Sequence, residues 1–471
     1  MRHENVTRRL FRLLFRMMAY RPPEIDVPAQ GVVLTDATVV NPGQARRKGQ
    51  TLVVQGDRVA SIEPSWGRAG DQACAGGYVL PGLIDMHVHI PPQIRSLIDL
   101  LFLAHGVTAI REVGDADGTT WQGRARVQQG FVPGPRIFTC GPALDGDPPF
   151  MPTSWPIRDA TEAREVVAAL AARGADFIKI HHKLSSEALT AIQEAAGDVG
   201  LRVVGHIPAS VPFEQAGVWD VQHLEGLAPH RSSSDTISDQ LRAWQTLTEA
   251  QIGDYVQVSA DQGLRHTPTL ITYDALARIA DPPSPDEPAW SLLPRHYWAG
   301  IWDRENIPML AGLSDDVIAL MKRKRDQTLD IAHRLHRAGV PLHLGTDTAA
   351  VPFVVPGLSL LQELRLVVDA GLTADAAWAA GSRVAGASLG VGRLGLVQEG
   401  APADLLIFDE DPTRDLDALS TLRGVIAQGR LYTRSFLDDA LAQHQARFSA
   451  PLYDTLTTTL VRLGAKLMAT N

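Results

Sequence analysis

Two histidines with metal-ligand spacing close one of the apolar segments of the chain. His87 and His89 end the segment LIDMHVHI (83–90), and residues two apart on a β-strand point to the same side of it. Two imidazoles on one side supply half of the ligands of a typical metal site. An H-x-H pair also arises by chance, so this pair alone leaves a metal site and a coincidence open.

Further ionisable residues end later apolar segments. His206 follows RVVG, His223 follows VQ, and Asp347 ends PLHLGTD. A lone histidine at a strand end is more often a packed core residue, and a lone aspartate often caps the next helix. Because so many separate explanations are less economical than one shared role, the set predicts a metal site built from several strands.

Lys179 stands out because the chain has only six lysines among its 44 basic residues. It lies in the apolar segment FIKI (177–180), where a charged ammonium is costly to bury. Burial lowers the pKa of a lysine and favours the neutral amine, which can react with CO₂ to form an anionic carbamate. A carbamate can bridge two cations. The alternative is a charged lysine paired with a carboxylate.

The elements that must position these residues alternate along the centre of the chain. Between about residues 80 and 390, eight short apolar segments alternate with helical stretches. This pattern is typical of an α/β fold with a (β/α)₈ barrel of the TIM type, whose active sites lie at the carboxyl ends of the strands. No glycine-rich phosphate loop is present, which disfavours a doubly wound nucleotide-binding sheet. The predicted strands are 83–90, 108–115, 136–142, 176–182, 202–207, 221–226, 266–272 and 341–347.

Both ends of the chain contain further strand-like segments. GVVLTDATVV and TLVVQGDRVASIEP near the start have the same β character as ADLLIFDEDP and LRGVIAQGRLYTR near the end. We therefore expect a small β-sandwich domain built from both ends of the chain. The predicted division is an amphipathic arm over 1–28, the β-sandwich domain over 29–80 and 396–435, the barrel over 81–395, and a helical tail over 436–471.

Composition excludes several classes of protein. A net charge of −9 argues against a nucleic-acid binder with a broad basic face. Two cysteines fit a reducing compartment, and no apolar run is long enough for a transmembrane helix, so we predict a cytoplasmic protein. Arg8, Arg12 and Arg16 share one face of an N-terminal helix. This arm is expected to pack on the chain or a sister subunit, to dock on an anionic membrane surface, or to fray.

Taken as a set, these residues resemble the amidohydrolase superfamily. The order H-x-H, Lys, His, His, Asp comes with similar flanking text: VLPGLIDMHVH, HGVTAIREVGD, GADFIKI, GHIPA, QHLEGL, LGTD and GLVQEGAPADLLIFDEDP. The similarity covers roughly residues 30–435. It is strongest to the imidazolonepropionase-like group, in particular to metal-dependent Xaa-Pro (prolidase-like) and Xaa-Arg/Lys dipeptidases.

The resemblance implies a binuclear centre of two divalent metal ions, usually zinc. It implies that a metal-bridging hydroxide attacks an amide carbonyl, with Asp347 as the catalytic general base and acid. The implied substrate is a small molecule: a dipeptide, an N-acyl amino acid or a related carboxamide. Relatives are commonly homo-oligomers. The implied ligands are His87, His89 and Asp347 for the more buried ion, His206 and His223 for the outer ion, and a carboxylated Lys179 that bridges the two.

Candidates for substrate contact carry weaker signals. His181, two residues after the strand lysine, shares its side of the strand, whereas His182 is expected to point away. Tyr273 follows TPTLIT and is a candidate hydrogen-bond donor to the carbonyl oxygen. Arg111 is either a substrate clamp or half of a structural ion pair with the following glutamate, and His230 is a further candidate.

Other functions on the same fold stay open. A mononuclear deaminase or cyclic amidine hydrolase shares H-x-H and Asp, but many such enzymes carry H-x-x-E at the fifth strand. Here His206 is followed by IPAS, and Glu214 comes eight residues later, which disfavours deamination. Lactone or phosphotriester hydrolysis is a further alternative. A non-catalytic relative would lose metal ligands, whereas this chain keeps all six.

Overall fold

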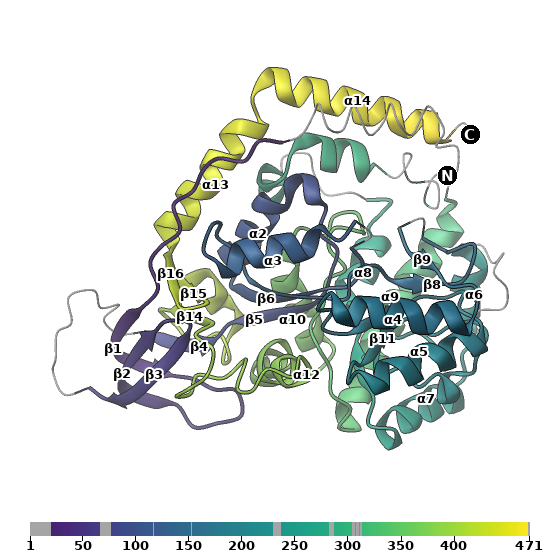
Figure 1. The fold of residues 1–471 in the computed structure, drawn as a ribbon, viewed down its shortest axis with the longest axis horizontal. Helices are drawn as coiled ribbons and strands as arrows, with labels where there is room; N and C mark the ends of the chain where they lie inside the picture. Colours follow the sequence, from purple (N-terminus) through teal and green to yellow (C-terminus); the bar gives the residue numbers. More distant parts are fainter. Residues whose placement is uncertain are drawn as a thin grey trace.

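The computed structural model describes residues 20–65, 77–115, 117–151, 153–228, 237–281, 287–303, 307, 310 and 313–469. Within these ranges the strands form three hydrogen-bonded sheets. Figure 1 shows the first sheet at one side of the molecule and the mixed strands and helices of the central segment beside it. The structure is therefore a mixed α/β fold.

Strands from both ends of the chain meet in a seven-stranded sheet. β4 joins the two groups, because it pairs in parallel with β1 and antiparallel with β14. All seven strands belong to one continuous sheet, so the two facing layers of a sandwich stay a prediction. The order is β16-β15-β14-β4-β1-β2-β3, with β1 Val32–Val39, β2 Arg47–Gln55, β3 Arg58–Pro64, β4 Tyr78–Pro81, β14 Leu405–Phe408, β15 Leu422–Ala427 and β16 Arg430–Thr433.

The central segment contains two sheets whose paired strands are all parallel. Their strands are short, and all but the exposed edge strand β9 are almost entirely buried, as expected where helices cover a parallel sheet. One sheet has the order β5-β6-β7, and the other has the order β13-β12-β11-β10-β8-β9. The strands are β5 Leu83–Val88, β6 Val107–Glu112, β7 Arg136–Thr139, β8 Leu144–Asp145, β9 Trp155–Pro156, β10 Ile178–Ile180, β11 Val203–Gly205, β12 Asp220–Gln222 and β13 Arg265–Thr267.

The segment predicted as the eighth strand, 341–347, forms isolated parallel bridges instead of a strand. Leu342 bridges to His266 beside β13, and Thr348 bridges to Val88 of β5. The segment thus contacts both central sheets. Asp347, the last residue of the segment, adopts a left-handed backbone conformation with φ of 59°, so no regular strand continues from the segment to Thr348.

Helices follow most central strands, and several begin at capping residues. The Asp159 side chain accepts hydrogen bonds from the first turn of α4, and Ser185 caps α5. The long helix α9 has acidic residues in its first turn and basic residues in its last, which complements its dipole. The central helices are α2 Arg95–Ala104, α3 Thr119–Gln128, α4 Ala160–Ala172, α5 Ser186–Asp198, α6 Ile237–Gln245, α7 Glu249–Asp261, α8 Leu270–Ala277, α9 Asp315–Arg337, α10 Leu358–Asp369, α11 Ala374–Ala379 and α12 Ala385–Ser388.

Two helices, α13 (Arg434–Phe448) and α14 (Pro451–Ala469), follow the seven-stranded sheet, where a helical tail is predicted. Figure 1 shows them along one edge of the molecule. The hydroxyl of Tyr20 lies 2.6 Å from Nδ1 of His444 on α13. Most of the predicted arm, with its three arginines, lies outside the described residues. Among the helices that the structure describes, none is both long and apolar enough to cross a membrane.

Candidate metal centre

All six predicted ligands line one cavity of about 380 Å³. His87 and His89 come from the end of β5, and Lys179 comes from β10. The other three follow β11, β12 and the 341–346 segment, so every one lies at or just past the carboxyl end of its strand. In parallel sheets these ends meet at one edge, which explains how residues 260 positions apart along the chain converge.

Asp347 is the centre of the first group of side chains. Its Oδ1 lies 3.3 Å from Nε2 of His87 and 3.2 Å from Nε2 of His89, and its Oδ2 lies 4.0 Å from Nε2 of His223. Burial raises the pKa of Asp347, but the neighbouring imidazoles, His87 foremost, outweigh burial and hold the pKa well below its usual range. The carboxylate is therefore ionised at neutral pH.

His87 provides the test of whether a cation fits this group. It is fully buried, its Nδ1 has no hydrogen-bond partner among the described residues, and its Nε2 approaches the Asp347 carboxylate at 3.3 Å without hydrogen-bond geometry. Burial holds its pKa well below the usual value, so the ring is neutral and one nitrogen has a free lone pair. Buried polar atoms almost always have partners. Imidazole nitrogens and a carboxylate oxygen so close together form the donor set that divalent zinc prefers, so the residues fit the metal.

Lys179 is buried and approaches the same cavity from β10. Burial lowers the pKa of its amine to about 8. Its Nζ donates a hydrogen bond to Oε1 of Gln222 on β12. No ion pair joins Lys179 to a carboxylate of the described residues, which weighs against the alternative of a charged, paired lysine. A lysine held in this way has a larger neutral fraction than an exposed one.

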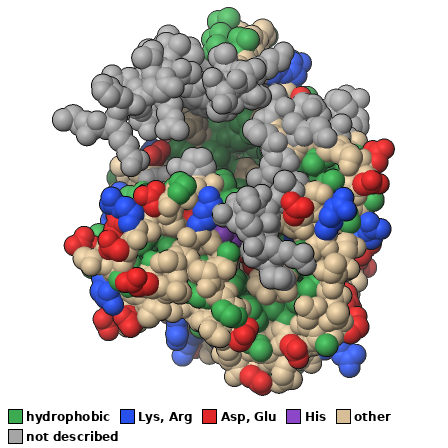
Figure 2. Space-filling model, turned by 90° about the vertical axis from the view of Figure 1, so that its right-hand side faces the viewer, with side chains coloured by type: hydrophobic (Ala, Val, Ile, Leu, Met, Phe, Trp, Pro, Cys, Tyr) green, Lys and Arg blue, Asp and Glu red, His purple; other side chains and the backbone are tan. Residues whose placement is uncertain are grey.

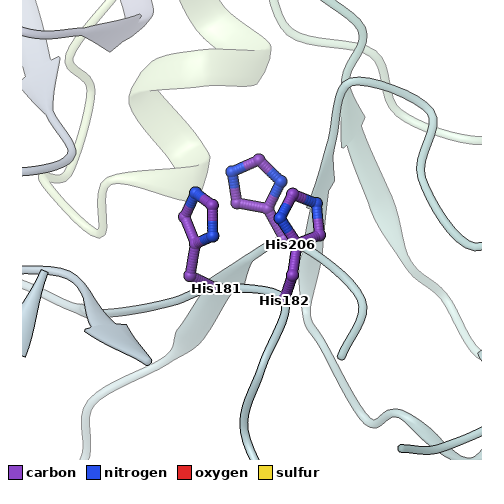
Figure 3. Close-up of side chains that lie close together, drawn as sticks. All are labelled: His181, His182 and His206. Atoms are coloured by element: carbon purple, nitrogen blue, oxygen red, sulfur yellow. The ribbon is translucent and has the colours of Figure 1, made fainter. Parts of the chain in front are cut away.

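A second histidine group contains His181, His182 and His206, whose rings lie close together in Figure 3. It lies beside the first group, since the ring centroids of His206 and His223 are 5.1 Å apart. Each of the three offers a ring nitrogen within 4.8 Å of the others. The ring centroid of His206 lies 4.0 Å from that of His181 and 4.3 Å from that of His182. The prediction that His182 points away is therefore wrong. β10 ends at Ile180, so the alternation of a strand does not extend to this residue.

Glu225 holds the second group together, although the sequence analysis did not single it out. Its Oε1 lies 2.8 Å from Nε2 of His182 and 2.8 Å from Nδ1 of His206. Burial raises the pKa of Glu225, but the two imidazoles outweigh burial and hold the pKa well below its usual range. The available signal was its position two residues after His223, within the motif QHLEGL. A buried carboxylate at a histidine ring orients that ring for metal binding.

The backbone at His223 is also specialised. Its φ of 58° lies in the left-handed region, which residues other than glycine adopt rarely. The Tyr273 hydroxyl donates to the backbone carbonyl of His223, and Nδ1 of His223 lies 2.7 Å from the hydroxyl oxygen of Thr269. These two bonds fix the direction of the imidazole. Tyr273 itself lies on α8, not at a strand end, and it lines a smaller neighbouring cavity.

Asp85 supports the first group from behind. It is fully buried on β5 and accepts hydrogen bonds from the backbone N–H of His87 at 3.2 Å and from the hydroxyl of Thr346 at 2.6 Å. Burial raises the pKa of this carboxyl to about 7. These bonds connect the ends of β5 and the 341–346 segment, from which three predicted ligands project.

The remaining candidates for substrate contact differ in position. His181 lines the metal cavity, and its ring stacks on Phe150 with centroids 5.4 Å apart. Arg111 is 2% exposed and pairs with the fully buried Asp220. Its Nε donates to the carbonyl of Met86, and this geometry favours the structural alternative. His230 lies outside the described residues.

Comparison with known proteins agrees with this geometry. The amidohydrolase family model matches residues 78–432. Among solved structures, bottromycin amidohydrolase is 22% identical, with 93% of each chain covered and a TM-score of 0.72. A Xaa-Pro dipeptidase with bound methionine in its active site is 19% identical, covering 86% of this chain and 100% of that one, with a TM-score of 0.62. The ochratoxinase of A. niger is 18% identical over 86% and 96% of the two chains, with a TM-score of 0.61.

At these identities the solved structures show a shared fold. A search of curated proteins finds no match. The family model spans three quarters of the chain and includes all six residues that line the cavity as predicted ligands. The chain therefore belongs to the amidohydrolase family, and it is a hydrolase.

Proposed function

We propose that this chain is a metal-dependent hydrolase that cleaves the amide bond of a dipeptide, an N-acyl amino acid or a related carboxamide. One observation carries the proposal: the six residues identified as ligands in the sequence line one cavity. The bottromycin amidohydrolase and Xaa-Pro dipeptidase folds support an amide substrate, because both names denote cleavage of such bonds.

The proposed centre holds two divalent ions, most simply zinc. His87, His89 and Asp347 would hold the first ion, His206 and His223 the second, and Lys179, once carboxylated by CO₂, would bridge them. When bound, the ions polarise the scissile carbonyl and lower the pKa of water. The buried, neutral imidazoles keep their lone pairs available, and Glu225 orients the ring of His206.

Asp347 is the proposed general base and acid. Its carboxylate is ionised, its side chain is 13% exposed, and the residue lines the cavity. It can therefore accept a proton from the attacking water and hold it at one carboxylate oxygen. The same oxygen then delivers the proton to the leaving nitrogen. His181 lines the cavity as a neutral ring and is the proposed contact to substrate.

The proposal includes a closed (β/α)₈ barrel formed by the two central sheets. Residues 341–348 bridge to both β13 and β5, and the N–H of Asp176 donates to the carbonyl of Thr139 at the other junction. Closure would place all strand ends around one mouth. We further propose a homo-oligomer in the cytoplasm, with the N-terminal arm on the chain or a sister subunit.

A substrate screen with matched variants tests the function. The zinc-loaded protein is assayed against dipeptides and N-acyl amino acids, beside Asp347→Asn and the distant surface control Asp369→Asn. We expect hydrolysis by the parent and the control, a loss of about 10³-fold or more in Asp347→Asn, and reversible loss on chelation of the metal. Hydrolysis that survives both chelation and Asp347→Asn would overturn the proposal.

A further inference from the structure

A second cavity, of about 60 Å³, adjoins the metal cavity and shares His223 with it. It also contains Glu225, so two residues of the metal centre form one of its walls. The rest of the lining consists of Gly226 and Ala228, which follow His223 in the chain, and of five residues on α6, α8 and α9. These five residues are Gln240, Ala243, Trp244, Tyr273 and Lys324.

Lys324 brings a positive charge into this small cavity. Its Nζ lies 4.5 Å from the ring centroid of Trp244 and 4.8 Å from that of Tyr273. The ammonium is therefore flanked by two aromatic faces, which attract a cation. Burial lowers the pKa of Lys324 to about 8, so most of the amine is still charged at neutral pH.

The charge of Lys324 lacks a carboxylate partner within the described part of the chain, unlike its neighbours on α9. Lys322 lies 3.7 Å from Asp281, and Arg325 lies 3.3 Å from Asp274. Glu225 attracts the ammonium electrostatically, but its carboxylate is already engaged by two histidines. A half-buried cation without a counter-ion is stabilised when an anion joins it.

The side-chain amide of Gln240 adds hydrogen-bond donors for an anion beside Lys324. Gln240 lines the same cavity, and its side chain makes no hydrogen bond to any residue that the structure describes. Its N–H donors are available to an oxygen that sits beside the ammonium. An ammonium and an amide N–H together match a planar anion such as a carboxylate, and the small volume admits a group of that size.

We propose that this cavity binds a carboxylate of the substrate, with Lys324 as its charge partner. The inference rests on the proposed amide hydrolysis, because it places the scissile amide in the metal cavity and the carboxylate beyond His223. It narrows the substrate class to acids, meaning dipeptides and N-acyl amino acids with a free carboxylate. Neutral carboxamides would leave the ammonium unpartnered.

Calorimetric titration of the zinc-loaded protein tests the subsite without requiring turnover. The probes are an N-methanesulfonyl amino acid and its carboxamide, which differ only in the carboxylate; their sulfonamide replaces the acyl amide and is not hydrolysed during the titration. We expect the parent to bind the acid at least tenfold more tightly than the amide. Lys324→Met should remove this preference and leave the affinity for the amide unchanged. Lys322→Met, on the same helix, should bind both probes as the parent does.

A metal contact to the carboxylate would also favour the acid, but it would persist in Lys324→Met and would overturn the proposal. The proposal would also be overturned if Lys324→Met bound both probes equally more weakly than the parent, or if the parent bound the acid no more tightly than the amide. Lys324→Arg keeps the charge and should retain the preference, which guards against a folding defect in the methionine variant. If the parent prefers the acid through Lys324 but hydrolyses neither dipeptides nor N-acyl amino acids, the subsite stands and the proposed function fails.

Discussion

Replacing Tyr273 with phenylalanine tests how the metal centre is held in shape. The Tyr273 hydroxyl donates to the backbone carbonyl of His223, whose φ of 58° lies in the left-handed region. Such a conformation costs of order 1–3 kcal/mol and persists only where its surroundings enforce it. Loss of the bond leaves a partly buried carbonyl unpaired, which costs about 1–3 kcal/mol. The two quantities are similar, so the strained conformation of His223 loses most of its support.

We expect the affinity for the more weakly bound zinc ion to fall about tenfold, which corresponds to about 1.4 kcal/mol. The affinity is measured by competition with a chromophoric chelator. Activity should fall in parallel and recover when excess zinc is added. Tyr297→Phe is the matched control, because Tyr297 is also buried but lies on η4 (Tyr297–Ile301), away from the metal cavity.

Unchanged zinc affinity in Tyr273→Phe, with kcat/KM reduced even at saturating zinc, would refute the positioning role. It would favour instead the role predicted from the sequence, in which the hydroxyl donates to the carbonyl oxygen of the substrate.

Three further predictions concern other parts of the structure. Arg111→Met should destabilise the protein by about 3–5 kcal/mol in urea unfolding, because it leaves the fully buried Asp220 without its partner; a change below 1 kcal/mol would contradict the structural role. Burial lowers the pKa of the fully buried His266 to about 4. Between pH 6.5 and pH 4 this histidine therefore binds a proton in the unfolded chain but not in the folded one. The free energy of unfolding decreases as the pH is lowered through this range, and the decrease reaches about 2 kcal/mol at pH 5. Between pH 7 and pH 5 the free energy of unfolding should decrease by about 2 kcal/mol less in His266→Gln than in the parent. Equal decreases in the two proteins would argue against a neutral His266. Glu225→Gln should weaken zinc binding tenfold or more, because His206 loses its carboxylate partner; unchanged affinity in the chelator assay would show that the pair does not support the centre.

The parts of the fold that the sequence predicts well are those with local signals. Apolar β-branched runs identify seven central strands, and capping residues such as Asp159 mark the starts of helices. The eighth segment forms only isolated bridges, and left-handed Asp347 stands at its end. The strand predicted to extend to residue 272 ends at Thr267, because Thr269 is also left-handed and caps α8. Aspartate adopts a positive φ more often than most residues, but threonine does so rarely, and residue type alone predicts neither position.

In the candidate site, too, some residues are predictable from local signals in the sequence and others are not. The six predicted ligands stand at strand ends, where spacing and residue type are informative, and they line one cavity. The partner of Arg111 was not predictable by proximity, because Asp220 lies 109 positions away. The adjacent Glu112 bonds to Thr139 instead, since neighbours on a strand point to opposite sides. Glu225 stands in the motif QHLEGL but is not at a strand end, and Lys324 lies in no motif, so only the fold shows that both lie near the histidines.

Figure 2 shows one face of the molecule, on which hydrophobic and charged side chains are interspersed. A hollow near the top of this face is lined with hydrophobic side chains, and a few histidine atoms are visible nearer its centre. The helices α13 and α14 run along one edge of the molecule (Figure 1) and contribute no residue to the lining of the metal cavity. Changes on them are therefore expected to affect stability or association rather than metal binding.

The most direct test of the account is metal stoichiometry, measured by elemental analysis on protein expressed with added zinc and bicarbonate. The parent should contain about two ions per chain. Lys179→Ala should lose metal, and Lys183→Ala, which removes a nearby lysine that does not line the cavity, should not. One ion in both parent and Lys179→Ala would contradict the bridging role of Lys179 and favour a mononuclear site. No bound metal in the parent would contradict the metal-dependent function itself.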